Sequence, residues 1–280
     1  MKVLACDGIH EDGLAMFRDA GWTVEISEPI KDTAKLAAAL EDCDAVLVRS
    51  ATKVPAEALE NAKRLKVIGR AGAGVDTIDV DAATARGIAV MNAPDGNTLA
   101  AAEHAISLLF ALARHVPRAD AGMKAGEWPK SGLTGFELEG KKLGVIGLGR
   151  IGGTVARKAQ GIGMDVAAYD PFLPTSAAGK GSVPLKSLDE LVAWADVITL
   201  HIPRTKDTTN LLSEERMRAM KKGAYIVNAA RGGLVDEAAL LQLLDEGHIA
   251  GAVQALRADS AHGPASIVDG MIGLHGRDHV

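Results

Sequence analysis

Short apolar runs rich in β-branched residues alternate with amphipathic helical patterns along most of this 280-residue chain. Strands separated by helices run parallel, because the chain crosses over the sheet before the next strand begins. The runs form two series, so we predict an α/β fold with two doubly wound parallel sheets, each covered by helices. The predicted strands cover residues 2–7, 23–27, 44–50, 65–71 and 88–94 in the first series, and 141–149, 165–170, 196–203, 223–231 and 249–253 in the second.

A long helical pattern separates the two series of strands. Its apolar positions recur at helical spacing from about Thr98 to His115, as in a helix with one buried face. We expect Pro117 to end this helix, and residues 119–140, which contain several glycines, to form a connection rather than a core element. The predicted buried stripe consists of Leu99, Ala102, Ile106, Leu109, Phe110 and Ala113.

Composition and charge exclude several classes of protein. The net charge is −5 and the sequence has no basic block, so we expect no nucleic-acid partner. The longest apolar run, residues 105–113, is too short to cross a bilayer, and the N-terminus lacks signal-peptide features, so we expect no membrane association. Cys6 and Cys43 lie in apolar contexts without disulfide or metal spacing. This usage favours a cytoplasmic protein without a metal site.

Residues 147–152 read GLGRIG, a G-x-G-x-x-G pattern, which alone is weak evidence in a chain with 31 glycines. The context strengthens it, because an apolar strand precedes the pattern, a helical pattern follows, and the next strand ends in Asp170. In a dinucleotide-binding loop Gly147 permits the tight turn, Gly149 lets backbone approach a pyrophosphate, and Gly152 allows close packing of helix and strand. The alternative is a tight glycine turn without a ligand.

The same segment predicts which dinucleotide binds. The N-terminus of the helix presents free N–H groups to the phosphates. Asp170 can accept hydrogen bonds from a ribose 2′-hydroxyl and would repel a 2′-phosphate, and the residues that follow it, PFLP, contain no arginine. We therefore predict NAD rather than NADP as the cofactor.

Three arginines stand where predicted strands end: Arg49, Arg70 and Arg231. Ligands of open parallel sheets bind beyond the carboxyl ends of the strands. The guanidinium fork matches two oxygens of a carboxylate or phosphate. Each arginine taken singly is compatible with an ordinary surface position, but three in the same topological position favour a small anionic substrate.

Two further polar residues each have two interpretations. Asn97 directly precedes the long helix, where it is either part of a site or only a turn residue or helix N-cap. His201 ends a predicted strand, where it either contacts the cofactor or is packed within the fold.

Several long motifs resemble those of the D-2-hydroxyacid dehydrogenases. In chain order they are VRSATKV, VIGRAGAGVDTIDVDAATARGIAVMNAPDGNT, LGVIGLGRIG, AAYDP and NAARGGLVDEAAL. The resemblance covers about residues 1–252. It implies a flavodoxin-like substrate-binding domain at residues 1–97 and a Rossmann-type NAD-binding domain at residues 98–254. It also implies that the long helix contributes to the interface of a homodimer or homotetramer.

The resemblance also implies an activity, hydride transfer between C2 of a D-2-hydroxyacid and NAD. The motifs are most similar to the branch that oxidises 3-phosphoglycerate to 3-phosphohydroxypyruvate in serine biosynthesis, and reduction of glyoxylate or hydroxypyruvate is the alternative. Arg231 matches the catalytic arginine of the family. The implied substrate-binding residues are Arg49, Ser50, Thr52, Arg70, Gly74, Val75 and Asn97. The implied cofactor-binding residues are Gly147, Gly149, Arg150, Ile151, Gly152, Asp170, Pro203 and Ala229.

The chain departs from the family pattern after about residue 252. The family continues with a strand ending in Asp-Val-Phe, then Glu-Pro and later Pro-His-x-Gly, whereas this chain reads VQALRADSAHG. No glutamate follows Glu246, and His262, His275 and His279 do not stand in the family's setting. We therefore expect a substrate domain without its C-terminal return segment and an atypical tail at residues 255–280, as a truncated or shifted reading frame would produce. Because the catalytic glutamate and histidine are not found, a catalytically impaired NAD-binding protein is the second hypothesis.

Overall fold

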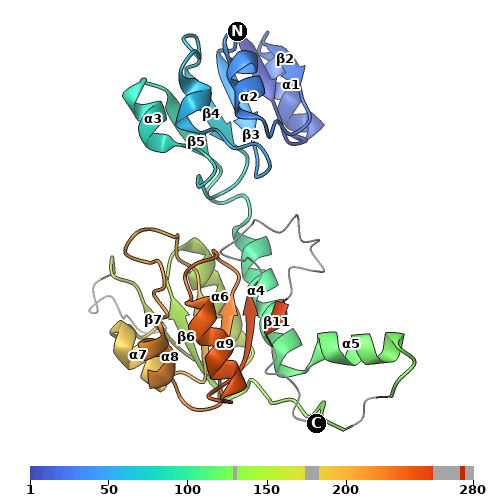
Figure 1. Ribbon diagram of the computed structural model, residues 1–280, viewed down its shortest axis with the longest axis vertical. Helices are drawn as coiled ribbons and strands as arrows, with labels where there is room; N and C mark the ends of the chain where they lie inside the picture. Colours follow the sequence, from blue (N-terminus) through green and yellow to red (C-terminus); the bar gives the residue numbers. More distant parts are fainter. Residues whose placement is uncertain (129–130, 174–182, 255–271, 275–280) are drawn as a thin grey trace. The chain divides into compact units, whose positions relative to one another are not determined.

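The computed structural model of the chain describes residues 1–128, 131–173, 183–254 and 272–274. Contacts between Cα atoms divide the chain into two compact units, which Figure 1 draws in blue to cyan and in green to red. We call them unit 1, Met1–Asn97, and unit 2, which begins at Thr98. The predicted tail lies outside the described residues, except for residues 272–274, and so do His262, His275 and His279.

Unit 1 is a five-stranded parallel sheet with the order β2-β1-β3-β4-β5. This is the flavodoxin-like order of a doubly wound sheet, so the predicted fold class is confirmed for this unit. The strands are β1 (Lys2–Ala5), β2 (Thr23–Ile26), β3 (Ala45–Val48), β4 (Val67–Arg70) and β5 (Ala89–Asn92). The helices are α1 (Glu11–Asp19), α2 (Thr33–Leu40), the 3-10 helix η1 (Ala56–Leu59) and α3 (Val80–Ala85).

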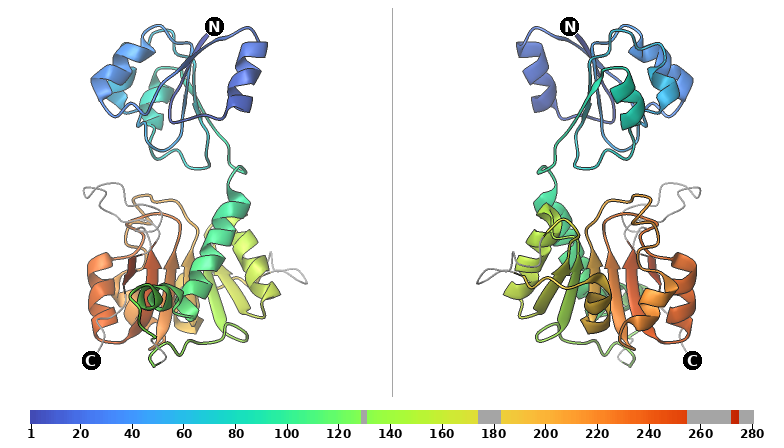
Figure 2. Two further views of the ribbon diagram at one scale, coloured as in Figure 1. Left: turned by 90° about the vertical axis from the view of Figure 1, so that its right-hand side faces the viewer. Right: turned by 90° about the vertical axis from the view of Figure 1, so that its left-hand side faces the viewer.

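The two faces of this sheet are covered unequally. Leu4, Val46 and Ile68 point to one face, where they form a buried cluster with residues of α2, η1 and α3. Figure 2 shows α1 on the opposite face. There a cavity of 430 Å³ with mostly apolar walls extends from Phe17 and Trp22 across the exposed side of β3, β4 and β5.

Unit 2 is a six-stranded sheet with the order β11-β10-β9-β8-β6-β7, in which β11 alone is antiparallel to its neighbour. The strands are β6 (Lys142–Ile146), β7 (Asp165–Tyr169), β8 (Val197–Leu200), β9 (Ala224–Asn228), β10 (Ile249–Gln254) and β11 (Ile272–Leu274). The helices are α4 (Thr98–Ala113), α5 (Val116–Lys124), α6 (Arg150–Gly161), α7 (Leu188–Trp194), α8 (Glu214–Ala219) and α9 (Glu237–Asp245).

A short extended segment at Leu185 continues this sheet beyond β7. Leu185 forms an isolated parallel bridge with Ala168, whose N–H donates to the carbonyl of Pro184 at 2.8 Å and whose carbonyl accepts from Lys186 at 2.9 Å. If this segment is counted as a strand, it is the third of unit 2 along the chain, and the parallel strands have the order 3-2-1-4-5-6. That is the order of the Rossmann fold, which confirms the second half of the predicted fold class.

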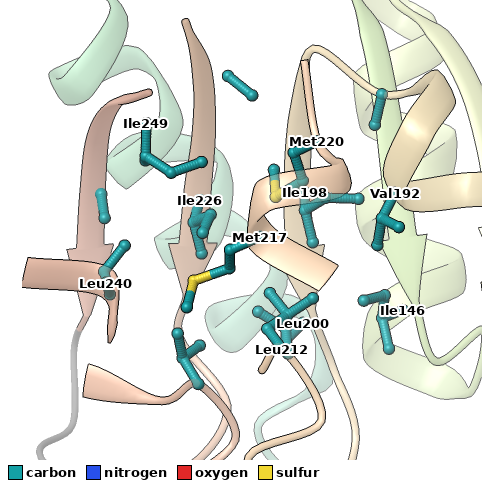
Figure 3. Close-up of a cluster of buried hydrophobic side chains, with 14 of the residues drawn as sticks. Ile146, Val192, Ile198, Leu200, Leu212, Met217, Met220, Ile226, Leu240 and Ile249 are labelled. Carbon is teal, nitrogen blue, oxygen red and sulfur yellow. The ribbon is translucent and has the colours of Figure 1, made fainter. Parts of the chain in front are cut away.

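Two apolar clusters fix the helices on the faces of this sheet. On one face, α4 and α6 cover residues such as Val145 and Val227. On the other face, α7, α8 and α9 cover Ile146, Ile198 and Ile226, and Figure 3 shows these side chains in one cluster with Met217 and Leu240. The sheet is therefore buried on both faces, as a parallel sheet must be.

The predicted long helix is present as α4, but its buried face differs in part from the prediction. Ala102, Leu109 and Ala113 are buried, whereas Leu99 and Phe110 are 60% and 42% exposed. The side of α4 that packs on α6, β9 and β10 is rich in alanine. These small side chains let α4 and α6 approach each other closely. The spacing of apolar residues alone could not identify this side.

The prediction of a connection over residues 119–140 was wrong at its start, because α5 occupies Val116–Lys124. His115 adopts a left-handed conformation with φ 52°, which separates α5 from α4. Pro117 lies in the first turn of α5, where its missing N–H costs nothing. No residue of α5 is buried, as predicted for a segment outside the core, but Leu138 near the end of the segment is buried in the apolar cluster with α4 and α6, so the prediction was wrong there.

Within the described residues, no single helix is long and apolar enough to span a membrane, and only α4 and α5 together pass that test, with a 66° bend between them.

Candidate functional site

The predicted site residues of unit 1 lie where parallel strands end. Arg49, Ser50 and Thr52 follow β3, the segment from Arg70 to Val75 follows β4, and Asn97 follows β5. Because the strands are parallel, all three segments leave the sheet at its carboxyl edge. A hydrogen bond connects the first two of these segments directly, from the side chain of Arg70 to the backbone carbonyl of Arg49.

Asp7, which sequence reasoning missed, holds the segment after β3. Its carboxylate accepts from the backbone N–H groups of Arg49 at 2.8 Å and Thr52 at 3.0 Å, and from the Thr52 hydroxyl at 2.5 Å. Burial by itself would raise the pKa of Asp7, but these hydrogen bonds outweigh burial and hold the pKa below its usual value. The side chain is therefore a carboxylate at neutral pH.

Thr52 lies beneath the surface that it was expected to line. Its side chain has no exposed area, and its hydroxyl donates to Asp7 while it accepts from the N–H of Ile30 at 3.0 Å. Arg49 and Ser50, by contrast, are exposed. The geometry therefore gives Thr52 a supporting role and leaves Arg49 and Ser50 accessible to a ligand.

Arg70 folds back over the glycine-rich loop that follows β4. Its Nε donates to the carbonyl of Arg49 at 3.2 Å. A Cβ atom at Gly72 would lie 2.5 Å from Nη1 of Arg70, so the absence of a side chain there makes room for the guanidinium. Asn92 Nδ2 donates to the carbonyl of Ala73 at 2.5 Å and ties the same loop to the end of β5. The half-buried residues Gly74 and Val75 complete this loop.

In unit 2 the three glycines of the GLGRIG loop have distinct geometries. Gly147 has φ +91°, and a Cβ there would lie 2.7 Å from the carbonyl oxygen of His201. A Cβ at Gly152 would overlap the carbonyl oxygen of Gly147. A Cβ at Gly149 would meet nothing within 4 Å, so this glycine faces open space at the start of α6. These are the three roles of a dinucleotide-binding loop: turn, close packing and ligand approach.

The N-terminus of α6 is left open to an anion. Side chains accept hydrogen bonds from first-turn N–H groups in α1, α2, α3, α7, α8 and α9, whereas Gly149, the N-cap of α6, offers no side chain. The first turn of α6 also lacks an acidic residue. Neither a capping side chain nor a first-turn carboxylate therefore competes with a phosphate for the positive end of the helix dipole. Arg150 and Ile151 begin the helix, the first exposed and the second half-buried.

Asp170 at the end of β7 connects to the same loop. Its Oδ2 accepts from the N–H of Leu148 at 2.9 Å, and its Oδ1 accepts from the N–H of Phe172 at 3.0 Å. Each carboxylate oxygen keeps a further lone pair, so the half-buried side chain can still accept from a ligand hydroxyl. The residues present at this end of the sheet thus fit a dinucleotide.

Asn228, also missed in the sequence, organises the loop that contains Ala229 and Arg231. Its Oδ1 accepts from the N–H groups of Ala230 at 3.1 Å and Arg231 at 3.4 Å. Its Nδ2 donates to the carbonyl of Arg231 at 2.8 Å and to Oε1 of Gln254 at 3.3 Å. The Arg231 side chain is half-buried, and its Nη1 donates to the carbonyl of Ala230 at 2.8 Å.

His201 and Pro203 follow β8. The Nε2 of His201 lies 2.9 Å from the hydroxyl of Thr199, and a Cβ on Gly152 would lie 3.3 Å from the His201 Cβ. Burial lowers the pKa of His201 to about 4, so the ring is neutral near pH 7. These contacts favour the packed interpretation of His201. Pro203 is exposed, and its carbonyl accepts from the Thr208 hydroxyl at 2.8 Å.

The signal for Asp7 and Asn228 was present but weak. Both are single polar residues at the carboxyl end of an apolar strand, in the stretches KVLACD and AYIVN. In the part of the chain that the structure describes, no three His, Cys, Asp or Glu side chains are grouped to hold a metal ion.

The sequence matches a known family over residues 106–254, described as D-isomer specific 2-hydroxyacid dehydrogenase, NAD binding domain. The chain belongs to this family. The family match includes the GLGRIG loop, Asp170 and Arg231, and its description agrees with the dinucleotide fit of unit 2.

Individual members of the family resemble most of this chain. It is 48% identical to the D-3-phosphoglycerate dehydrogenase of Archaeoglobus fulgidus over 252 residues, which is 90% of this chain and 48% of that protein. The chain thus spans about half the length of this curated relative. A glyoxylate reductase from Paecilomyes thermophila is similar in structure, with a TM-score of 0.84, 30% identity and coverage of 94% of this chain and 83% of that chain. D-lactate dehydrogenase from Aquifex aeolicus, solved with NAD and lactic acid, gives a TM-score of 0.79, 29% identity and coverage of 95% and 83%.

Proposed function

We propose that this chain is an NAD-dependent dehydrogenase that oxidises 3-phosphoglycerate at C2 to 3-phosphohydroxypyruvate, the entry step of serine biosynthesis. The observation that carries the proposal is the open N-terminus of α6, with Gly149 facing free space and Asp170 beside the loop. The high identity to a D-3-phosphoglycerate dehydrogenase supports the choice of substrate.

In this proposal the residues of unit 2 hold the cofactor. The first-turn N–H groups of α6, together with Arg150 and Ile151, bind the pyrophosphate, and Asp170 accepts from the adenosine ribose. The charge of Asp170 disfavours a 2′-phosphate, which selects NAD over NADP. Pro203 and Ala229 lie beside the cofactor. When bound, NAD⁺ supplies the hydride acceptor.

The substrate is held by guanidinium groups and backbone. Arg49 and Ser50 bind the phosphate of 3-phosphoglycerate. Arg70 and Asn97 bind either the same phosphate or the C2 hydroxyl. The N–H groups around Gly74 and Val75 bind the carboxylate. Arg231 orients the carboxylate and the oxygen at C2, and Asn228 holds its backbone for this role. Thr52 is held by the same carboxylate oxygen of Asp7 as the backbone of Arg49.

A second candidate function is NAD binding with little or no turnover. The proton of the C2 hydroxyl needs a base, and the glutamate and histidine of the family motifs are not found in the sequence. His201 is a poor substitute, since burial lowers its pKa to about 4 and Thr199 engages its Nε2. Reduction of glyoxylate is a third candidate, favoured by the similar structure of a glyoxylate reductase.

One set of measurements separates these candidates. Calorimetry with NAD and with NADP tests the cofactor, and an assay of NADH formation from 3-phosphoglycerate tests turnover. Arg49→Ala is expected to weaken 3-phosphoglycerate binding at least about tenfold and glyoxylate binding less than about twofold. Lys53→Ala, which removes an exposed cation nearby, is the matched control and should change neither. Equal losses of affinity for 3-phosphoglycerate and glyoxylate in Arg49→Ala would contradict the phosphoglycerate assignment. NAD binding without turnover in the wild-type protein would favour the second candidate function.

We also propose that two or four copies associate through α4 and α5. Exposed apolar side chains gather on this segment, and Figure 1 shows α5 leading away from the sheet of unit 2. Light scattering should report a dimer or tetramer that Phe110→Glu weakens, whereas Leu241→Glu, which replaces an exposed leucine on α9, should leave the mass unchanged. A monomeric wild-type protein would contradict this proposal. The exposed residues are Leu99 and Phe110 on α4, Val116 and Met123 on α5, and Trp128 shortly after α5.

A cytoplasmic location completes the proposal. Cys6 and Cys43 are free thiols, which persist in reducing compartments. A fluorescent fusion of the full chain, viewed in living cells, tests it, and an extracellular signal would contradict it.

A further inference from the structure

Asp7 occupies a special backbone position two residues after the end of β1. Its φ is 63°, in the left-handed region that residues other than glycine rarely adopt. Such a conformation persists only when the surrounding structure holds it in place, and it is often found at functional sites. The contacts of the side chain show what Asp7 is held against.

Three hydrogen bonds join the Asp7 carboxylate to the segment Arg49–Thr52. Oδ2 accepts from the N–H of Arg49 and from the N–H of Thr52, and Oδ1 accepts from the Thr52 hydroxyl. The partners are 42 and 45 residues away in the sequence. A single charged side chain therefore connects the end of β1 to the loop that carries Arg49.

A second step extends this connection to Arg70. The peptide unit of Arg49 lies between two partners, since its N–H donates to Asp7 and its carbonyl accepts from Nε of Arg70. The Arg70 side chain, which passes over Gly72, is therefore held by a residue that Asp7 holds. A carboxylate that accepts several N–H and O–H groups is fixed more firmly than a neutral acceptor, because charged hydrogen bonds are stronger.

We propose that Asp7 is a positioning residue for anion recognition, which sets the Arg49 loop and, through the Arg49 carbonyl, the guanidinium of Arg70 for the phosphate and carboxylate of the substrate. This proposal rests on the proposed function, because it assigns Asp7 to the binding of the same phosphorylated acid. Asp7 acts through the two arginines and does not touch the ligand.

A merely structural aspartate gives the control for this proposal. Asp44 precedes β3 at the opposite edge of the same sheet, and its buried carboxylate accepts from the N–H of Lys2 at 2.8 Å and from Arg64 at 3.1 Å. Asp44→Ala removes a comparable set of hydrogen bonds without touching the segments after β3 and β4. Loss of stability alone should therefore affect Asp7→Ala and Asp44→Ala similarly.

The experiment compares 3-phosphoglycerate binding in the full-length chain by calorimetry, at a temperature below the unfolding transition of every variant. Asp7→Ala is expected to weaken binding at least about tenfold, Asp7→Asn by about threefold because its amide accepts with one oxygen only, and Asp44→Ala by less than about twofold. NAD affinity should be unchanged in all three variants, since the cofactor residues belong to unit 2. Equal losses in Asp7→Ala and Asp44→Ala would overturn the proposal.

Two further outcomes are decisive. If Asp7→Ala does not fold, the comparison of Asp7→Asn with wild type decides, and wild-type affinity in Asp7→Asn overturns the positioning role. If the wild-type chain itself does not bind 3-phosphoglycerate, the proposed function fails and the role of Asp7 fails with it. This failure of the proposed function is distinguishable from a failure of the Asp7 role alone, because it is seen in the wild-type protein.

Discussion

The side chain of Asn228 closes the turn that carries Arg231. Its Oδ1 accepts the Arg231 N–H at 3.4 Å, and its Nδ2 donates to the Arg231 carbonyl at 2.8 Å. Asn228 has no exposed area. One buried asparagine therefore holds both backbone polar groups of Arg231.

Replacing Asn228 should destabilise unit 2 and loosen Arg231. Asn228→Ala leaves the carbonyl of Arg231 and the buried Oε1 of Gln254 without this donor, which should cost about 1–3 kcal/mol. Thermal unfolding and calorimetry with 3-phosphoglycerate measure the two effects. Gln160→Ala, a change of an exposed amide on α6, is the control. Wild-type stability in Asn228→Ala would show that the amide does not hold the turn.

The GLGRIG loop allows stability and cofactor binding to be separated by two alanine substitutions. Gly152→Ala places a Cβ against the backbone carbonyl of Gly147, which cannot move freely, so it should destabilise unit 2 by roughly 1–3 kcal/mol or more. Gly149→Ala meets open space, so stability should change by less than about 0.5 kcal/mol while NAD affinity falls at least about tenfold. Unfolding curves and NAD titrations check the pair. Unchanged NAD affinity in Gly149→Ala would contradict the proposed cofactor position.

Gly72 should matter for binding more than for stability. Its Cβ would meet only the tip of the Arg70 side chain, which can swing away, so Gly72→Ala should change the free energy of unfolding by less than about 0.5 kcal/mol. The displaced guanidinium should nevertheless bind 3-phosphoglycerate less tightly, by about threefold to tenfold. Calorimetry measures the change, with Gly13→Ala on α1 as a distant control. Equal affinities in the two variants would argue against a role of Arg70.

His201 predicts a specific dependence of stability on pH. Its pKa is lowered from 6.5 in the unfolded chain to about 4 by burial, so only the unfolded chain takes up this proton between these values. The stabilising contribution is fully present above pH 6.5, falls as the pH drops through that window, and is lost below about pH 4. The slope is at most about 1.4 kcal/mol per pH unit.

The melting temperature of wild type and of His201→Gln, followed from pH 7 to pH 4, tests this dependence. Glutamine keeps a polar partner for Thr199 but does not titrate, so the variant should lose less stability on acidification. Other titrating groups are common to both proteins and cancel in the difference. Parallel curves would mean that His201 is not buried in neutral form.

The two parallel sheets and the glycine loop follow from local sequence. A helix between two consecutive strands carries the chain across the sheet, so the strands run parallel. The GLGRIG loop is recognised from its neighbours in the sequence, a strand before it and a helix after it. The short segment at Leu185 was not predicted, because a single bridge has no periodic pattern. α5 was not predicted either, since none of its residues is buried and it has no apolar stripe.

Local pattern therefore establishes the fold class, the strands β1 to β10 and the dinucleotide loop of this protein. It does not establish which side of α4 is buried, because Leu99 and Phe110 fit the helical period as well as Ala102 does. Nor does it reveal the roles of Asp7 and Asn228, because their hydrogen-bond partners depend on the order of strands in the sheet and on the geometry of the turn. Asp7 meets Arg49 only because β1 and β3 are neighbours in the sheet, although 42 residues separate the two in the chain. Hydrogen bonds across such distances exist only after the strands have paired, and for that physical reason no sequence pattern contains them.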